Sequence, residues 1–249
     1  MAETNDNLVL IGGESSGGKT ASLRNLKNPE GVMYLNCESN KKCSFPAKFQ
    51  QFSITDPYQV YEGFEYAYKN QGNFHTIVID TVTFLMDMFE SVHVLPAKDT
   101  MRGWSAYQQY FKNLMQKYVA KSKCNIIMLA HVRSIINESA MVMEKKVPIK
   151  GALQANGVES YFSTVVSARR IPIIELDKYK NDLLNITEEE EMLGFKHVYQ
   201  TKLTKETVNE RIRASMGMWD TKETFIDNDA QYLLDRLHAY YGSTSVVTA

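Results

Sequence analysis

Short runs of consecutive apolar residues recur along the chain, and stretches with helical periodicity separate many of them. An apolar run of this length is typical of a strand that is buried on both faces of a sheet. The predicted strands cover 8–11, 31–36, 49–54, 76–80, 125–131, 163–169, 195–203 and 224–226. The predicted helices cover 21–26, 56–70, 104–121, 152–161 and 228–241. This alternation predicts an α/β fold, with a mainly parallel central sheet and helices on both faces.

The remaining segments are polar or mixed and predict connections between the elements. We expect loops at 93–103 and 133–150, and a solvated acidic insertion at about 185–194. The chain of 249 residues has room for one large domain, which we place at 7–241. We expect a flexible arm at 1–6 and a flexible tail at 242–249.

Composition narrows the functional classes without selecting one. The chain is 44% hydrophobic and 23% charged, as is ordinary for a soluble globular protein. Its apolar runs are too short to span a membrane, and the polar N-terminus is unlike a signal peptide, so we expect a cytoplasmic protein without a membrane partner. The three cysteines cannot all pair with one another, and Cys37 and Cys43 lack further ligands for zinc. A net charge of −1 still allows a local basic patch for nucleic acid.

The segment from Gly13 to Thr20 fits the pattern G-x-x-x-x-G-K-[ST] and lies between a predicted strand and a predicted helix. This pattern predicts that the backbone N–H groups of the segment surround a polyphosphate. Lys19 would contact the β- and γ-phosphates, and the Thr20 hydroxyl would bind Mg²⁺. The field at the start of the following helix would add to anion binding. The nucleotide-binding candidates are Gly13, Glu14, Ser15, Ser16, Gly17, Gly18, Lys19, Thr20 and Ala21. The sequence therefore predicts a site for ATP and Mg²⁺.

Three polar residues at the ends of predicted strands are the candidate companions of this loop. Asp80 ends the strand 76–80 in the Walker B pattern, which predicts a metal-binding carboxylate beside the P-loop strand. Glu38 follows the second strand and could position or deprotonate the attacking water, or it could be a surface glutamate. His131 ends the fifth strand and could contact the γ-phosphate, or it could be only a polar strand end.

Together these motifs resemble the RecA-like ATPase core. The resemblance rests on the P-loop, the Cys37-Glu38 pair, the sequence Val78-Ile79-Asp80-Thr81 and the strand that ends Leu129-Ala130-His131-Val132-Arg133. Lys150 to Gln154 and the strand ending in Arg169 and Arg170 are similar to later parts of that core. The resemblance covers roughly residues 8–205, and the compact form is similar to phage-encoded RecA-like recombination ATPases, the Sak-four group of single-strand annealing proteins.

The resemblance implies a RecA-like P-loop ATPase that binds single-stranded DNA and anneals or exchanges strands. It implies Glu38 as catalytic base, His131 as γ-phosphate sensor, and a homo-oligomer, ring or filament, in the cytoplasm (of the host, if a phage encodes it). A single-strand-binding protein is a further expected partner. The candidate DNA contacts are Arg133, Lys145, Lys146 and Lys150. The candidates for a finger that reaches a neighbour's γ-phosphate are Lys202, Lys205 and Arg211, with Arg213 competing for the role.

Two other functions remain open from the sequence. A nucleotide kinase would need a mobile lid with arginines, whereas the best lid candidate, 133–150, is rich in lysine and carries only Arg133. A nucleotide-switched loader of a replication or recombination protein would not need Glu38. Turnover that depends on Glu38 would separate the ATPase from the switch.

Overall fold

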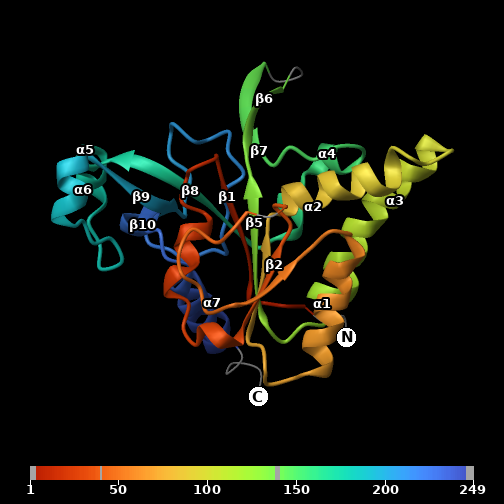
Figure 1. The fold of residues 1–249 in the computed structure, drawn as a ribbon. Coiled ribbons are helices and arrows are strands. Elements are labelled where there is room, and N and C mark those ends of the chain that lie inside the picture. Colours follow the sequence, from red (N-terminus) through yellow and green to blue (C-terminus); the bar gives the residue numbers. More distant parts are fainter. Residues whose placement is uncertain (1–3, 40, 138–140, 245–249) are drawn as a thin grey trace.

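The central sheet of the computed structural model has eight strands in the order β10-β9-β8-β1-β5-β4-β2-β3 (Figure 1). The structure describes residues 4–39, 41–137 and 141–244. The strands are β1 (Leu8–Gly13), β2 (Val32–Asn36), β3 (Gln50–Ser53), β4 (Thr76–Asp80), β5 (Asn125–His131), β8 (Thr164–Pro172), β9 (Phe195–Gln200) and β10 (Phe225–Asp227). Strands β8, β1, β5, β4, β2 and β3 pair in parallel with one another. Strands β9 and β10 are antiparallel to their neighbours. The predicted α/β class with a mainly parallel sheet is confirmed.

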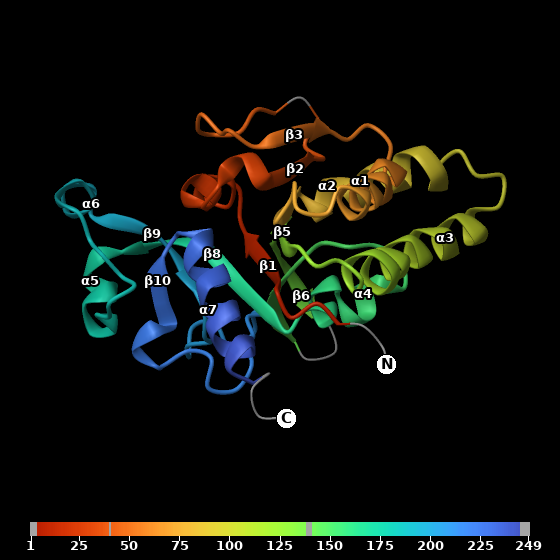
Figure 2. The same cartoon turned by 90° about the horizontal axis from the view of Figure 1, so that it is seen from below.

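Helices cover both faces of this sheet (Figure 2). The α-helices are α1 (Tyr58–Lys69), α2 (Val82–Phe89), α3 (Thr100–Asn113), α4 (Leu153–Asn156), α5 (Ile173–Leu176), α6 (Glu188–Leu193) and α7 (Ala230–Thr244). Short 3-10 or π-helical turns are η1 (Thr20–Asn25), η2 (Pro29–Gly31), η3 (Glu90–Val94), η4 (Leu114–Val119), η5 (Val158–Tyr161), η6 (Asp177–Tyr179) and η7 (Lys222–Thr224). Helices α1 to α3 pack on one face, and η1 and α7 pack on the other.

The central residues of β4, Ile77 to Ile79, are all apolar because both faces of the strand are covered. Ile77 and Ile79 belong to the core under α1 to α3, and Val78 belongs to the core under α7. All three side chains are fully buried. A strand covered on both faces has no solvent-facing position, so the period-2 alternation disappears.

The strand order corrects one expectation about the site. We expected the strand that ends in Asp80 to lie beside the P-loop strand, but β5 lies between β1 and β4. Chain order does not determine sheet order, because each crossover can skip a position. The consequence is that His131, at the end of β5, lies between the P-loop and Asp80.

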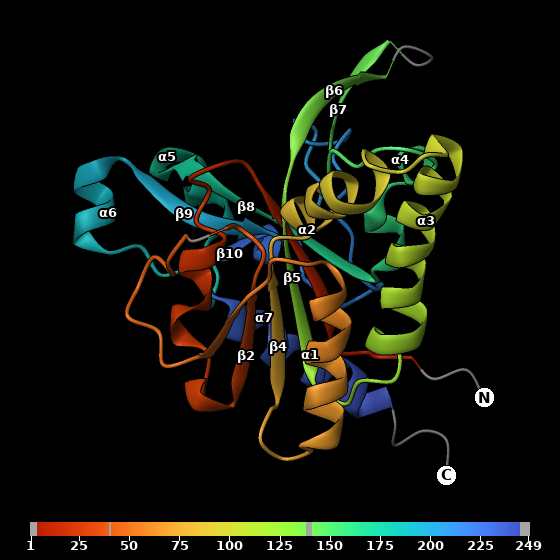
Figure 3. The ribbon, with the colours of Figure 1, turned by 45° about the vertical axis from the view of Figure 1, so that its right-hand side comes forward.

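The segment 133–150 is not a loop, as the sequence had suggested, but contains a hairpin. Strands β6 (Arg133–Asn137) and β7 (Val142–Lys146) pair antiparallel and extend beyond the end of β5, away from the sheet (Figure 3). Many of its side chains are exposed, including Ile136 and Met143. Because the hairpin stands clear of the core, its sequence carries no clean apolar alternation.

One helical segment was not predicted, and the start of another differs from prediction. The segment after Asp80, to which no element was assigned, forms α2 and η3. The long helix predicted from Trp104 begins at Thr100, because the Asp99 side chain accepts a hydrogen bond from the Arg102 N–H at 3.1 Å and caps it. The predicted loop 93–103 is correspondingly shorter.

Segments expected to be solvated contain more order than composition indicates. The acidic insertion forms the exposed helix α6, and a capping box between Thr187 and Glu190 starts it. In the predicted arm, the Asn5 amide donates to the carbonyls of Ser122 and Cys124. Within the predicted tail, α7 continues to Thr244, and residues 1–3 and 245–249 lie outside the described ranges. In the described part of the chain, no helix combines the length and apolar character needed to cross a bilayer.

Candidate nucleotide site

The P-loop leaves the end of β1 and turns tightly before η1. Gly18 has φ +92°, and a Cβ there would lie 2.4 Å from Asn228 Nδ2. The Asn228 amide donates to the Gly18 carbonyl at 2.9 Å, so the turn is held against the start of the last helical segment. A Cβ on Gly13 would come within 2.7 Å of the Ala168 carbonyl on β8. Glycine is therefore required at Gly13 by the close approach of backbone, and at Gly18 by the positive φ.

The helix after the P-loop is the six-residue 3-10 helix η1 rather than an α-helix. Glu14, Ser15 and Ser16 at the tip of the loop are exposed, and Gly17 is buried. Ala21 lies within η1 and is half-buried. The loop thus presents its tip to solvent and its sides to the sheet, an open cradle for a polyphosphate.

Lys19 is buried beneath the P-loop. Its ammonium donates to the carbonyls of Gly13 at 3.0 Å and Glu14 at 2.8 Å. Burial lowers the pKa of Lys19 to about 8, against the attraction of Asp80 and Glu38. A triphosphate would restore the charge-stabilising contacts that this ammonium lacks.

Asp80 lies at the end of β4 and is 1% exposed. Its Oδ2 accepts hydrogen bonds from the Thr20 hydroxyl at 2.9 Å and the Tyr34 hydroxyl at 2.5 Å. Burial raises the pKa of Asp80, although both hydrogen bonds oppose the rise. Tyr34 was not predicted as a site residue, because in the sequence it is one more aromatic residue in a buried strand.

The residues around Asp80 fit Mg²⁺. Within the described residues, its Oδ1 is buried without a hydrogen-bond partner, and a buried carboxylate oxygen of this kind needs a donor or a cation. The Thr20 hydroxyl, already 2.9 Å from Oδ2, is a second oxygen ligand of the type that Mg²⁺ prefers.

Glu38, two residues beyond β2, faces His131 at the end of β5. Glu38 Oε1 lies 3.1 Å from His131 Nε2, and His131 Nδ1 lies 3.4 Å from the Lys19 ammonium. Because an ammonium can only donate, Nδ1 accepts from Lys19 and Nε2–H donates to Glu38. The histidine therefore connects the P-loop lysine to the candidate base.

Lys41 forms an ion pair with the other Glu38 oxygen, Oε2. Burial alone would raise the pKa of Glu38, but hydrogen bonds from His131 and Lys41 outweigh it and hold this pKa at about 2. Thr83 on α2 helps to hold His131 in place, since its hydroxyl accepts a hydrogen bond from the His131 backbone N–H at 2.9 Å. Sequence reasoning missed both residues, because neither occupies a strand end.

The predicted DNA contacts do not share one environment. Arg133 is exposed on β6, whereas Lys145 pairs with Glu14 at the tip of the P-loop at 2.8 Å. Lys146 pairs with Glu144 at 3.4 Å, and Lys150 pairs with Glu90 at 2.5 Å. Among the described residues, Arg133 is the one of the four with no carboxylate within 4 Å.

Each of the three candidate finger residues contacts a group of its own chain. Lys202 donates to the Trp219 carbonyl at 3.3 Å, and Arg211 pairs with Glu144 at 3.2 Å. Lys205 pairs with Glu206 at 3.6 Å, and its side chain is 89% exposed.

The parallel sheet, the P-loop and the carboxylates at the ends of neighbouring strands define a P-loop nucleoside triphosphatase. Residues 5–207 match the family of the AAA domain, and the chain belongs to that family. No curated protein matches the chain.

Proposed function

We propose that this protein is a RecA-like, Mg²⁺-dependent ATPase that binds single-stranded DNA and promotes annealing or strand exchange in recombination. The observation that carries the proposal is the position of His131. It contacts Lys19 and Glu38, and it lies two residues before Arg133, the first residue of the hairpin β6–β7. One short segment of chain therefore joins the phosphate end of the site to an exposed arm.

In this proposal the P-loop and its lysine bind ATP. The backbone of residues 13–20 surrounds the phosphates, and Lys19 turns from the carbonyls that it now contacts to the β- and γ-phosphates. Thr20 and Asp80 hold Mg²⁺, which neutralises charge on the phosphates when bound. Tyr34 fixes the orientation of Asp80 through its 2.5 Å hydrogen bond.

Glu38 orients the attacking water and accepts its proton. With a pKa of about 2, the carboxylate is ionised but weakly basic while His131 and Lys41 both donate to it. Withdrawal of either donor would raise its pKa and strengthen it as a base. Movement of His131 on contact with the γ-phosphate is thus a means of switching Glu38 on.

The hairpin β6–β7 is the proposed DNA contact. Arg133 is exposed on it, and Ile136 and Met143 are 54% and 55% exposed, so the arm offers a cation for phosphate and apolar side chains for bases. Lys145 is better placed to connect the arm to the P-loop, because it pairs with Glu14. DNA bound along the arm would therefore act on both His131 and Glu14.

Assembly and location follow from the same proposal. Lys205 is the most exposed of the finger candidates and is best placed to reach a neighbouring copy. Lys202 would first have to break its hydrogen bond to the Trp219 carbonyl, and Arg211 its ion pair with Glu144. The protein would work in the cytoplasm, of the host if a phage encodes it. A single-strand-binding protein is a natural partner there, because both proteins meet the same DNA.

The test is ATP turnover with and without single-stranded DNA across a salt series. We expect stimulation that fades as salt rises, because phosphate contacts release counterions. Arg133→Ala should weaken stimulation, and the control Lys27→Ala, on the α7 side of the sheet, should not. Absence of both stimulation and binding at low salt would overturn the DNA role, and phosphate transfer to a nucleoside would indicate a kinase instead.

A further inference from the structure

A basic groove lies near the amino end of the parallel strands, away from the P-loop. It encloses about 820 Å³ between the last turns of α1 and the segment that runs from η4 into β5. Phe64, Phe74 and Tyr68 contribute apolar surface, and the Tyr68 side chain is 64% exposed. A hollow of this size with exposed aromatic surface is large enough to receive several side chains of a binding partner.

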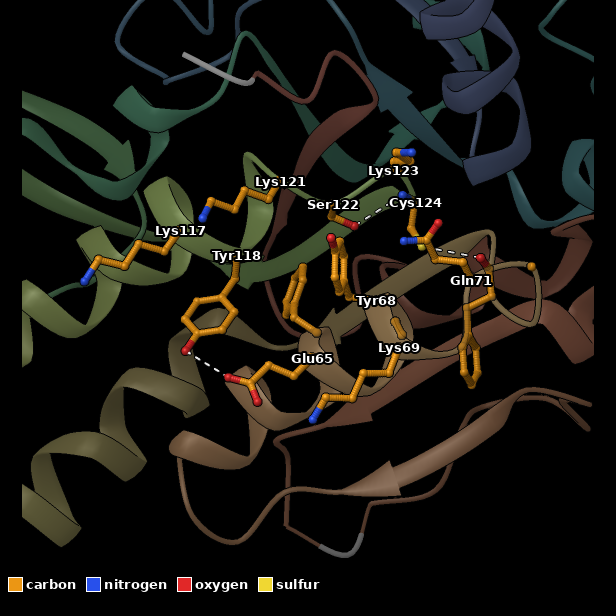
Figure 4. Close-up of a pocket in the computed structure, with 14 residues that line it drawn as sticks. Glu65, Tyr68, Lys69, Gln71, Lys117, Tyr118, Lys121, Ser122, Lys123 and Cys124 are labelled. Atoms are coloured by element: carbon orange, nitrogen blue, oxygen red, sulfur yellow. Dashed lines mark hydrogen bonds between the residues drawn. The ribbon is translucent and has the colours of Figure 1, made fainter. Parts of the chain in front are cut away.

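Four lysines surround this groove, namely Lys69, Lys117, Lys121 and Lys123. Figure 4 shows Lys117 and Lys121 on one side of the aromatic rings and Lys69 on the other. Glu65 is the one carboxylate among the lining residues, and it already accepts a hydrogen bond from Tyr118 at 3.4 Å. Across the ranges that the structure describes, none of the four ammonium groups lies within 4 Å of a carboxylate. The groove therefore favours an acidic partner with apolar side chains.

The helix α6 presents the complementary chemistry. Its residues are Glu188, Glu189, Glu190, Glu191, Met192 and Leu193. Glu190 Oε1 forms an ion pair with the Lys196 ammonium at 2.7 Å, but among the described residues the other three glutamates of the helix have no ion-pair partner. Met192 is 90% exposed and Leu193 is 57% exposed. The helix therefore offers a partner two adjacent apolar side chains beside unpaired carboxylates.

This helix is ordered before it meets a partner. The Thr187–Glu190 capping box starts it, and Gly194, with φ +77°, ends it. A rigid element loses less conformational entropy on binding than a flexible tail with the same residues.

The acidic helix and the basic groove cannot meet within one copy. The helix α6 lies beyond β9 at one flank of the sheet, and the groove lies by α1 at the other (Figures 1 and 3). Charge complementarity between surfaces that lie on opposite flanks can be satisfied only between molecules.

We propose that α6 of one copy docks in the basic groove of the next copy. Its free glutamates pair with the groove lysines, and Met192 and Leu193 cover the aromatic floor. The contact joins two different surfaces, so it is heterologous and generates a ring or an open chain of copies rather than a closed twofold dimer. It requires neither nucleotide nor DNA, so it stands independently of the proposed recombination function.

The test is the mass of the full-length chain in solution, measured by light scattering or sedimentation without nucleotide. For the wild type we expect a mean mass that rises with protein concentration above 28.5 kDa and falls with salt, because exposed ion pairs are screened. A groove variant carries Lys69→Glu, Lys117→Glu and Lys121→Glu. A helix variant carries Glu188→Lys, Glu189→Lys and Glu191→Lys.

Each variant alone should remain a single copy, since like charges then face one another. A mixture of the two, and a chain that carries both sets of changes, should regain assembly, which a misfolded variant could not do. The control Lys27→Glu, on the α7 side, should assemble as the wild type does.

Three results would overturn the proposal. The wild type could remain a single copy at its highest soluble concentration, or the two reversals could leave its mass unchanged. Alternatively, the groove variant could lose affinity for a single-stranded oligonucleotide while its mass stays that of the wild type, which would identify the groove as a nucleic-acid site instead.

Discussion

Removal of a single oxygen at Tyr34 tests how the metal-binding carboxylate is held. Tyr34→Phe removes the 2.5 Å hydrogen bond to Asp80 Oδ2 and leaves the ring in place. Both residues are buried, at 2% and 1% exposure, so water cannot replace the lost donor. A hydrogen bond to a charged group contributes about 1.5–3 kcal/mol to stability. We therefore expect the free energy of unfolding to fall by that amount.

The assay is thermal unfolding without ligand, followed by the same measurement with MgATP. For a chain of this size, about 1.5–3 kcal/mol corresponds to a melting temperature lower by about 3–12 °C. The affinity for Mg²⁺ should also fall, because Tyr34 no longer fixes the orientation of the Asp80 carboxylate. The matched control is Tyr118→Phe, whose hydroxyl meets Glu65 at 3.4 Å in a half-exposed position and should change stability little. Equal, small losses in both variants would refute the reasoning.

Two further predictions concern charge at the P-loop. Burial lowers the pKa of Lys19 to about 8 when no nucleotide is bound, and a bound triphosphate would raise this pKa. Affinity for MgATP should therefore be full below pH 8 and fall about tenfold per pH unit above it. A flat profile from pH 7 to 9.5 in a binding titration would contradict this. The Glu14–Lys145 pair, in which Glu14 is exposed and Lys145 is half-buried, should add little to stability. Lys145→Glu should nevertheless reduce DNA-stimulated turnover, and the exchange Glu14→Lys with Lys145→Glu should restore it. Failure of the exchange to restore stimulation would remove this pair from the proposed coupling.

The sequence predicted which strand ends lie near the P-loop better than it predicted the order of the strands. Asp80 and His131 end their strands and Glu38 follows β2 by two residues, so the parallel arrangement brings them to one edge of the sheet. That β5 lies between β1 and β4 could not be predicted, because long crossovers allow several orders with the same apolar pattern.

The elements that sequence reasoning missed share a physical cause, namely that burial did not shape their pattern in the usual way. The hairpin β6–β7 is largely solvent-exposed and so lacks a buried face to impose alternation. Helix α2 spans only eight residues and begins two residues after the apolar strand β4 ends, so the sequence shows no clear boundary between strand and helix. Tyr34 has an apolar ring suited to the core, and only the structure shows that its hydroxyl meets Asp80.

The most direct test of the central claim is single-turnover hydrolysis by Glu38→Gln. Glutamine retains the size and much of the hydrogen bonding of Glu38 but cannot accept a proton from water. We expect ATP and Mg²⁺ to bind as they do to the wild type, while the rate of hydrolysis falls by roughly 10²–10⁴-fold, the usual contribution of a general base. Hydrolysis within about twofold of the wild-type rate, at unchanged ATP affinity, would contradict the account; a positioned general base contributes far more than that.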